Sequence, residues 1–287
     1  MASITTTDGI RLHYEESGSG MPVVFVHEFA GDHRAWEPQV RYLSRSHRCV
    51  AFASRGYPPS DVPEAAEAYS QDIARADVIA IMDALKIKKA HIVGHSMGAY
   101  TALHVGIHHP DRCLSVSALG CGWGSKPEDR QESARACEAI AELFEKESIT
   151  IAAAKYARFP MRATFEAKDP RGFAEFERML AEHSGKGSAL TMLNLQQKRP
   201  TLWDMKSQLE AFKLPLLVLV GDEDHPCVDG SLFLKRTVPQ AALVVVPRAG
   251  HTITLEEPAV VNAALSELFS AVSLGTWMSH RARHAAS

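Results

Sequence analysis

Long apolar runs and paired cysteine motifs are both missing from this sequence of 287 residues. The longest clean apolar stretch, Leu214 to Val220, is far shorter than the roughly 18 residues that a membrane span requires. The five cysteines are scattered without CxxC spacing, which argues against a disulfide framework and against a zinc site. We therefore expect reduced thiols, no metal and no contact with a membrane.

A large excess of charge is also missing, because the formal net charge at pH 7 is only -3. This balance argues against nucleic acid as a partner. The N-terminal residues have neither a basic start nor an apolar run, so we expect no secretory signal and a cytoplasmic location. With 46% hydrophobic residues, the chain can bury a large core. Its length slightly exceeds the usual single-core limit of about 250 residues, which permits one domain with an insertion.

Short continuous apolar runs, several of them rich in valine, are the main structural signal. An alternating segment around Asp8-Gly9 first predicts a β-hairpin. The apolar runs that follow are typical of strands buried on both faces of a parallel sheet. Amphipathic segments between them predict an α/β fold, with a mostly parallel sheet flanked by helices. The runs are Pro22 to His27, Arg48 to Ala53, Ala90 to Val93, Cys113 to Leu119, Pro215 to Val220 and Ala242 to Val246.

The alternation of strands and helices stops in the middle of the chain. Residues 121–207 show helical patterns separated by prolines and no convincing strand. We therefore predict a sheet domain from residues 1–120 and 208–274, with a helical cap inserted at 121–207. The polar, basic segment 275–287 is predicted to be a poorly ordered tail.

Ser96 lies in the sequence Gly94-His95-Ser96-Met97-Gly98, between an apolar run and a helical pattern. A serine on such a strand-to-helix turn has a strained backbone, requires small neighbours two residues away and projects its hydroxyl from the sheet edge. The amide of Met97, at the start of the helix, is then available to bind developing negative charge. Ser96 is therefore our candidate nucleophile.

A nucleophilic serine needs a base, and the base needs an acid that orients it. His251 is the candidate base because it lies in a glycine-containing loop directly after the last apolar run. The preceding run ends in Asp222, Glu223 and Asp224, of which two at least are expected to be solvated loop carboxylates. The resulting order of serine, aspartate and histidine is the order that α/β-hydrolases use.

The chain resembles the α/β-hydrolase family from about residue 4 to residue 273. Gly94–Gly98 matches the nucleophile elbow of that family, and AGHT at 249–252 matches the loop that bears its base. In the family's Gly-x-x-Asp loop the acid lies three residues beyond the glycine, which implies Asp224, with Asp222 as the alternative. The residue after the family's His-Gly pair supplies the second oxyanion amide, which implies Phe29 beside Met97.

Two motifs depart from the family pattern. The His-Gly pair becomes His27-Glu28, and the usual Asp-x-Arg-Gly-x-Gly becomes ASRGYP at 53–58. A carboxylate aimed into the oxyanion hole would repel the charge that forms there. Glu28 is therefore expected to point elsewhere, either in an ion pair with Arg34 or Arg55 or toward the pocket mouth.

The resemblance implies a cofactor-free serine hydrolase that cleaves a small carboxylic ester or lactone through an acyl-enzyme on Ser96. Three alternatives stay open: a carbon-carbon bond hydrolase of the meta-cleavage-product type, a cofactor-free haloperoxidase or perhydrolase, and a hydrolase-like ligand receptor. The loop from residue 30 to 40 is similar to that of 3-oxoadipate enol-lactonases. The oligomeric state is not indicated. The expected substrate contacts are Glu28, Tyr57, Trp123, Phe159 and Trp203.

Overall fold

A single sheet forms the centre of the computed structural model, which describes residues 2–277. Within these residues the sheet is 8-stranded, in the order β1-β2-β4-β3-β5-β6-β7-β8. β2 pairs antiparallel with both β1 and β4, and every other neighbouring pair is parallel. The strands are β1 (Ser3–Thr5), β2 (Arg11–Ser17), β3 (Met21–Val26), β4 (His47–Phe52), β5 (Ala90–His95), β6 (Cys113–Leu119), β7 (Leu216–Gly221) and β8 (Ala241–Val246).

Burial on both faces explains why continuous apolar runs form these strands. Successive side chains of β3 point to opposite faces, so Val23 and Phe25 join one core cluster while Val24 and Val26 join the other. Each of the six predicted runs coincides with a strand, and the hairpin around Asp8-Gly9 also forms. Gly9 has a φ of +84°, a left-handed conformation that favours glycine in such a turn.

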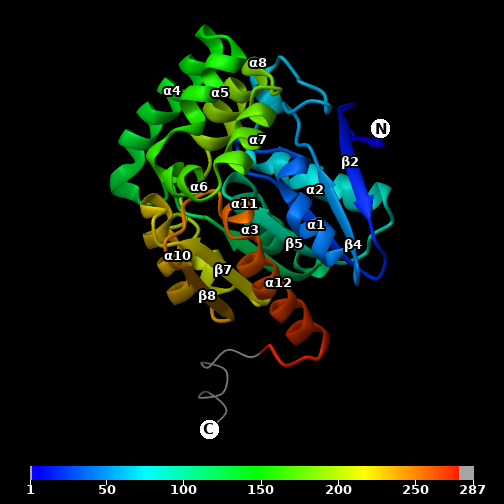
Figure 1. Cartoon of the computed structure of the whole chain (residues 1–287). Helices are drawn as coiled ribbons and strands as arrows, with labels where there is room; N and C mark the ends of the chain where they lie inside the picture. Colours follow the sequence, from blue (N-terminus) through cyan, green and yellow to red (C-terminus); the bar gives the residue numbers. More distant parts are fainter. Residues whose placement is uncertain (1, 278–287) are drawn as a thin grey trace.

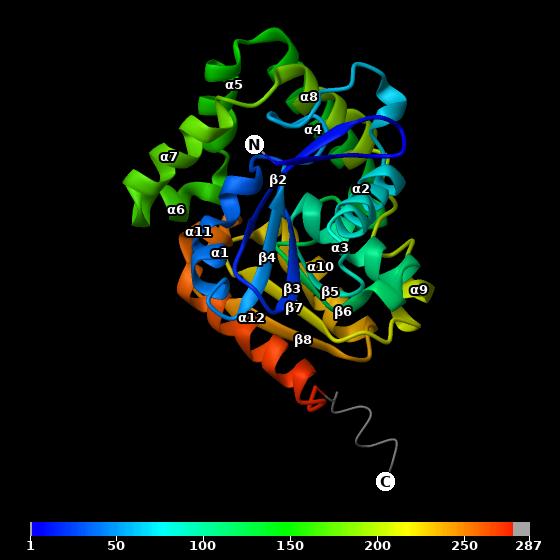
Figure 2. The same ribbon diagram turned by 90° about the vertical axis from the view of Figure 1, so that its right-hand side faces the viewer.

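Helices cover both faces of the sheet. α1 and α12 pack against each other on one face, and α2, α3 and α10 cover the other (Figure 2). The predicted α/β fold, with a mostly parallel sheet flanked by helices, is confirmed. These helices and the short α11 are α1 (Glu37–Leu43), α2 (Gln71–Ala84), α3 (Met97–His108), α10 (His225–Thr237), α11 (Ile253–Glu256) and α12 (Pro258–Ser273).

The chain between β6 and β7 is built of helices and turns, with no strand in residues 120–215, all of which the structure describes. Most of these helices gather at one end of the molecule, above the sheet (Figure 1). Their apolar side chains share a core with Phe29 and Met97. The boundaries at 121 and 207 stay predictions. The helices are α4 (Arg130–Lys146), α5 (Ile149–Ala157), α6 (Ala163–Lys168), α7 (Pro170–Leu180), α8 (Gly185–Leu190), a π-helix (Thr191–Gln196) and α9 (Lys206–Glu210).

The predicted tail, 275–287, is described only as far as residue 277. The indole of Trp277 donates a hydrogen bond of 3.0 Å to the carbonyl of Gln240 and packs against the core cluster beneath α12. The prediction for residues 278–287 lies outside the described residues. Among the helices of residues 2–277, none combines the length and the apolar character that a membrane crossing demands.

The turn between β5 and α3 is shaped by two glycines that approach other backbone atoms closely. Ser96 at its apex has a φ of +53° and a ψ of -111°, a strained conformation for a residue with a side chain. A Cβ on Gly94 would lie 2.0 Å from the carbonyl oxygen of Gly98, and a Cβ on Gly98 would lie 2.0 Å from that of Val26. Both flanking glycines are therefore required by space.

Gly98→Ala is expected to lower the free energy of unfolding by about 3 kcal/mol, because the backbone of β3 must move to admit the methyl group. Gly9→Ala is the control, since a Cβ there meets nothing within 4 Å and only the φ of +84° is unfavourable. We expect that control to lose about 1 kcal/mol. Urea denaturation followed by circular dichroism measures both, and equal losses would contradict the steric explanation.

Candidate active site

Ser96, His251 and Asp224 meet at the carboxyl edge of the sheet. Ser96 follows β5, Asp224 follows β7 and His251 lies in the loop after β8; these parallel strands end at the same edge. Nε2 of His251 lies 2.9 Å from Oγ of Ser96, and Nδ1 of His251 lies 2.8 Å from Oδ2 of Asp224. The structure thus brings the three predicted residues into one hydrogen-bonded chain, the arrangement that makes a serine hydroxyl nucleophilic.

The geometry favours Asp224 over Asp222 as the partner of the histidine. Asp224 is fully buried beside His251. Asp222 is exposed and instead accepts a hydrogen bond of 3.3 Å from the amide of Ala249, which holds the loop before His251. A buried carboxylate keeps its partner imidazole in one orientation, whereas an exposed one competes with water.

The two expected oxyanion amides lie on adjacent segments. Phe29 follows β3, and Met97 is the first residue of α3, where a helical amide has no partner within its own helix. Within residues 2–277, neither amide donates a hydrogen bond to the protein. The partial positive charge at the start of a helix adds to the attraction for an anion. The ring of Phe29 is buried and meets the ring of Tyr156 edge to face at 5.2 Å.

His95 supports the loop that carries His251. Its Nε2 lies 2.7 Å from the carbonyl oxygen of His251. Burial lowers the pKa of His95 to about 4, so the ring is neutral at pH 7. A carbonyl oxygen only accepts, so Nε2 must carry the proton and donate it. The sequence did not predict this contact, although the position of His95 beside Ser96 was the available signal.

Glu28 forms a buried ion pair, but its partner is neither of the two arginines expected from the sequence. Nη2 of Arg162 donates a hydrogen bond of 2.6 Å to Oε2 of Glu28, and both side chains are almost fully buried. Arg162 ends the short turn Pro160–Arg162, between α5 and α6. The expected pairing with Arg34 or Arg55 is wrong. Arg34 pairs instead with Asp32 and Glu182. Arg55 pairs with Asp8 and Asp77.

The carboxylate of Glu28 lies close to the reacting groups. Its Oε2 is 3.9 Å from Nε2 of His251, the nitrogen that faces Ser96. Burial by itself raises the pKa of Glu28, but Arg162, His95 and His251 together lower it to about 2. Glu28 is therefore ionised at pH 7, and the adjacent guanidinium offsets its charge. This pairing explains how an acidic residue is accommodated where the family has glycine.

The turn Pro160–Arg162 makes a second contact with the site. The carbonyl of Met161 accepts a hydrogen bond of 2.8 Å from the amide of His251. One short segment of the helical region therefore binds both Glu28 and the loop of the candidate base. The helical region contributes to the geometry of the triad as well as to the shape of the cavity.

A cavity of about 550 Å³ opens onto Ser96 and His251. Trp123 and Phe159 lie in its wall, as expected. Glu223 and His225 also lie in the wall, and their position on either side of Asp224 was the signal that could have identified them. The other lining residues are Phe29, Ala136, Ile140, Tyr156, Pro160, Met161, Ala163, Thr164, Gln196 and Pro226.

Three expected substrate contacts lie outside this cavity wall. Glu28 is buried in its ion pair. The ring of Tyr57 is fully buried and lies 4.7 Å from the ring of His27. It belongs to the core that the helical region shares with Phe29 and Met97. Trp203 stacks on Phe233 at 4.1 Å and packs against the main core. Each of these side chains contacts other protein groups and does not face the cavity.

We expect Glu28→Gln to lower the free energy of unfolding by about 3–5 kcal/mol, because it leaves the buried Arg162 cation without a counter-charge. The double change Glu28→Gln with Arg162→Met removes both charges and should recover part of the loss. The difference between wild type and Glu28→Gln should shrink as the pH falls from 4.5 towards 2. Over that window the wild-type carboxylate becomes protonated, so the stability that its depressed pKa provides above 4.5 disappears.

Urea denaturation at a series of pH values measures these differences. Glu182→Gln is the control, because Glu182 pairs with Arg34 at the surface, where an ion pair contributes less than about 1 kcal/mol. A Glu28→Gln variant as stable as the wild type would contradict the account of a buried pair. So would a double variant that loses the sum of the two single losses.

Comparisons with known proteins agree with this architecture. A family model described as alpha/beta hydrolase fold matches residues 21–258. A thermophilic esterase from Thermogutta terrifontis superimposes with a TM-score of 0.83 at 28% identity, covering 94% of this chain and 98% of its own. 3-Oxoadipate enol-lactonase 1 of Acinetobacter baylyi is 28% identical, over 89% of this chain and 91% of that protein. A putative 2-succinyl-6-hydroxy-2,4-cyclohexadiene-1-carboxylate synthase of Bacillus subtilis is 24% identical, over 94% and 98%. The chain belongs to the alpha/beta hydrolase fold family.

Proposed function

We propose that this protein is a serine hydrolase that cleaves a small carboxylic ester or lactone without a cofactor. The observation that carries the proposal is the chain of hydrogen bonds from Asp224 through His251 to Ser96, which ends at a largely apolar cavity. The likeness to an esterase and an enol-lactonase, each at 28% identity, supports the same class of substrate.

In the first half of the reaction, Oγ of Ser96 attacks the carbonyl carbon while Nε2 of His251 takes the hydroxyl proton. Asp224 holds the ring and stabilises the imidazolium that forms. The carbonyl oxygen becomes an oxyanion, which the amides of Phe29 and Met97 bind. The imidazolium then gives its proton to the leaving oxygen, and the alcohol departs from an acyl-enzyme on Ser96.

In the second half, His251 takes a proton from a water molecule, which attacks the acyl carbon. The tetrahedral species collapses, the proton returns to Oγ of Ser96 and a carboxylic acid is released. For a lactone the leaving alcohol stays attached to the acyl group, so hydrolysis gives a single hydroxy acid. Both substrate types use the same groups, which is why the geometry serves either.

The helical region is proposed to act as a cap that selects the substrate. Trp123 and Phe159 place aromatic surface in the cavity wall, and Ile140 and Tyr156 add further apolar area. An apolar wall binds an acyl or aryl group by burying it, whereas Glu223 and His225 are exposed polar residues of the same wall. Most of the cavity wall thus comes from a region that is separate in sequence from the segments that carry the triad.

The alternatives left open by the sequence differ in product rather than in site. p-Nitrophenyl esters and lactones test the proposed activity, and dienoic diketo acids test carbon-carbon bond cleavage. Peracid formed from acetate and peroxide would indicate a perhydrolase. A hydrolase-like receptor would show no steady turnover of simple esters. Hydrolysis of an ester or lactone at a far higher kcat/KM than the other reactions is the expected result.

We expect Ser96→Ala and His251→Ala each to lower kcat/KM for an ester by about 10³-fold or more, because the three residues act as a unit. Asp224→Asn should lose far more activity than Asp222→Asn, which is the matched control from the same loop. Initial rates with p-nitrophenyl butyrate measure the losses. A greater loss in Asp222→Asn would show that the acid is assigned to the wrong residue.

Trp123→Ala is expected to change the ranking of p-nitrophenyl esters by acyl chain length, because Trp123 lies in the cavity wall. One or two methylene groups buried in such a wall correspond to about 10-fold in kcat/KM. Trp203→Ala is the matched control, since Trp203 packs on Phe233 and should lower stability while leaving the ranking intact. An unchanged ranking in Trp123→Ala would argue against a role for this residue in substrate choice.

A further inference from the structure

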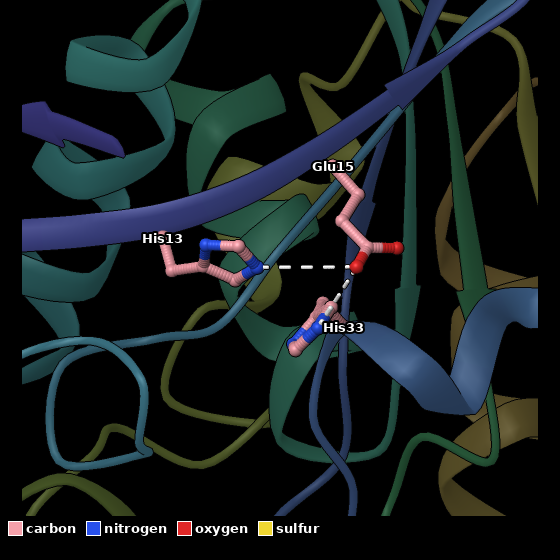
Figure 3. A group of neighbouring side chains, drawn as sticks. All are labelled: His13, Glu15 and His33. Carbon is pink, nitrogen blue, oxygen red and sulfur yellow. Dashed lines mark ion pairs between the residues drawn. The ribbon is translucent and has the colours of Figure 1, made fainter. Parts of the chain in front are cut away.

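Three side chains with metal-binding atoms converge away from the active site. His13 and Glu15 project from β2, and His33 is the first residue of the short turn His33–Trp36 that follows the Phe29 loop. Nε2 of His33 lies 3.5 Å from Oε1 of Glu15, and Nε2 of His13 lies 4.0 Å from the same oxygen. Figure 3 shows both rings turned toward the one carboxylate. None of the three residues lines the cavity at Ser96.

The rings of His13 and His33 are both buried, although their ring nitrogens have no hydrogen-bond partners in the part of the chain that the structure describes. The side chains of His13 and His33 are 6% and 7% exposed, whereas that of Glu15 is 67% exposed. Within residues 2–277, Nδ1 of each ring is buried without a hydrogen-bond partner, and neither Nε2 makes a hydrogen bond. The two rings meet edge to face with their centroids 4.6 Å apart, and one ligand atom from each of His13, Glu15 and His33 lies within 4.8 Å of the others. Packing therefore fixes two imidazole nitrogens beside one accessible carboxylate oxygen.

This set of atoms suits a divalent transition metal. Zinc binds imidazole nitrogen and carboxylate oxygen at about 2.0–2.2 Å, so neighbouring ligands in a tetrahedral site lie about 3.3–3.6 Å apart. The distance from His33 to Glu15 already falls in that range, and the distance from His13 needs only a few tenths of an ångström of adjustment. Calcium and magnesium prefer sites built from oxygen alone, which these two imidazoles do not provide.

We propose that His13 Nε2, His33 Nε2 and Glu15 Oε1 form a binding site for Zn²⁺ or a similar first-row divalent ion. Water completes the coordination on the exposed side, where Glu15 meets solvent. Asp32 Oδ1 lies 3.6 Å from Nδ1 of His33, on the far side of that ring; this is too long for a hydrogen bond but places a negative charge beside the imidazole. Asp32 is itself buried and held by Arg34.

A bound ion would link two segments that otherwise meet here through the packed rings of His13 and His33. Glu15 and His13 belong to the hairpin at the edge of the sheet, and His33 lies four residues after Phe29. The ion would therefore hold the loop of a proposed oxyanion amide against the hairpin. Since the unfolded chain does not present this arrangement, binding should stabilise the folded protein.

The experiment is a calorimetric titration of Zn²⁺ into untagged, EDTA-treated protein, with melting temperature as a second measurement. One equivalent is expected to bind and to raise the melting temperature. His33→Gln and His13→Gln should each weaken binding at least about 10-fold. Glu15→Gln should also weaken it, and because Glu15 is exposed this variant keeps the fold intact even where a buried histidine cannot be replaced. Glu64→Gln, an exposed glutamate elsewhere with the same change of charge, should bind as the wild type does.

A second group of potential ligands, Asp224, Cys227 and His251, belongs to the triad region and supplies a further control. Asp224→Asn removes one of those ligands and should leave zinc binding unchanged. Loss of binding in Asp224→Asn would place the ion at the triad and overturn the proposal. Wild-type affinity in Glu15→Gln, or the absence of a binding event in the wild type, would overturn it as well.

Discussion

The close contact between Gly98 and the carbonyl of Val26 determines where the other parts of the site lie. Gly98 has no Cβ, and this allows the start of α3 to lie directly against the end of β3. Ser96 is held at a φ of +53° on the turn between β5 and α3, and the chain beyond Val26 leads within three residues to Phe29. The hydroxyl and the two amides of the proposed oxyanion hole therefore lie on segments at one edge of the sheet.

Charge sets a second constraint on this edge. Glu28 places a carboxylate 3.9 Å from the nitrogen of His251 that faces Ser96, where an unpaired negative charge would oppose formation of an oxyanion. Arg162 neutralises it from the helical region, and Met161 in the same turn binds the amide of His251. The helical region thus takes part in the electrostatics of the site, so movement of the turn Pro160–Arg162 would alter the triad as well as the cavity.

The features predicted correctly from the sequence depend on local pattern. Continuous valine-rich runs are typical of strands buried on both faces of a parallel sheet, and glycines two residues on either side of Ser96 satisfy a local steric need. The family resemblance, and not a local pattern, implied Asp224 with Asp222 as the alternative, and Asp224 is the residue that lies 2.8 Å from His251. The partner of Glu28 could not be predicted in this way. Arg162 lies 134 residues away in the sequence, and the packing of the helices determines which arginine contacts Glu28. The sequence also does not show whether an aromatic side chain points into the cavity or into the core. Both Trp123 and Trp203 were expected in the cavity wall, but only Trp123 lies there, and Trp203 packs on Phe233. The group of His13, Glu15 and His33 is visible only in the fold, because two separate segments contribute to it.

The most direct test of the central claim is covalent labelling with a fluorophosphonate, followed by intact mass measurement and peptide mapping. Such reagents phosphonylate a serine whose hydroxyl is activated by a neighbouring base, with loss of fluoride. Ser96 should carry a single label, and His251→Ala should react far more slowly because Oγ then lacks its proton acceptor. Labelling at another residue, or an unchanged rate in His251→Ala, would contradict the assignment of Ser96 as a nucleophile activated by His251.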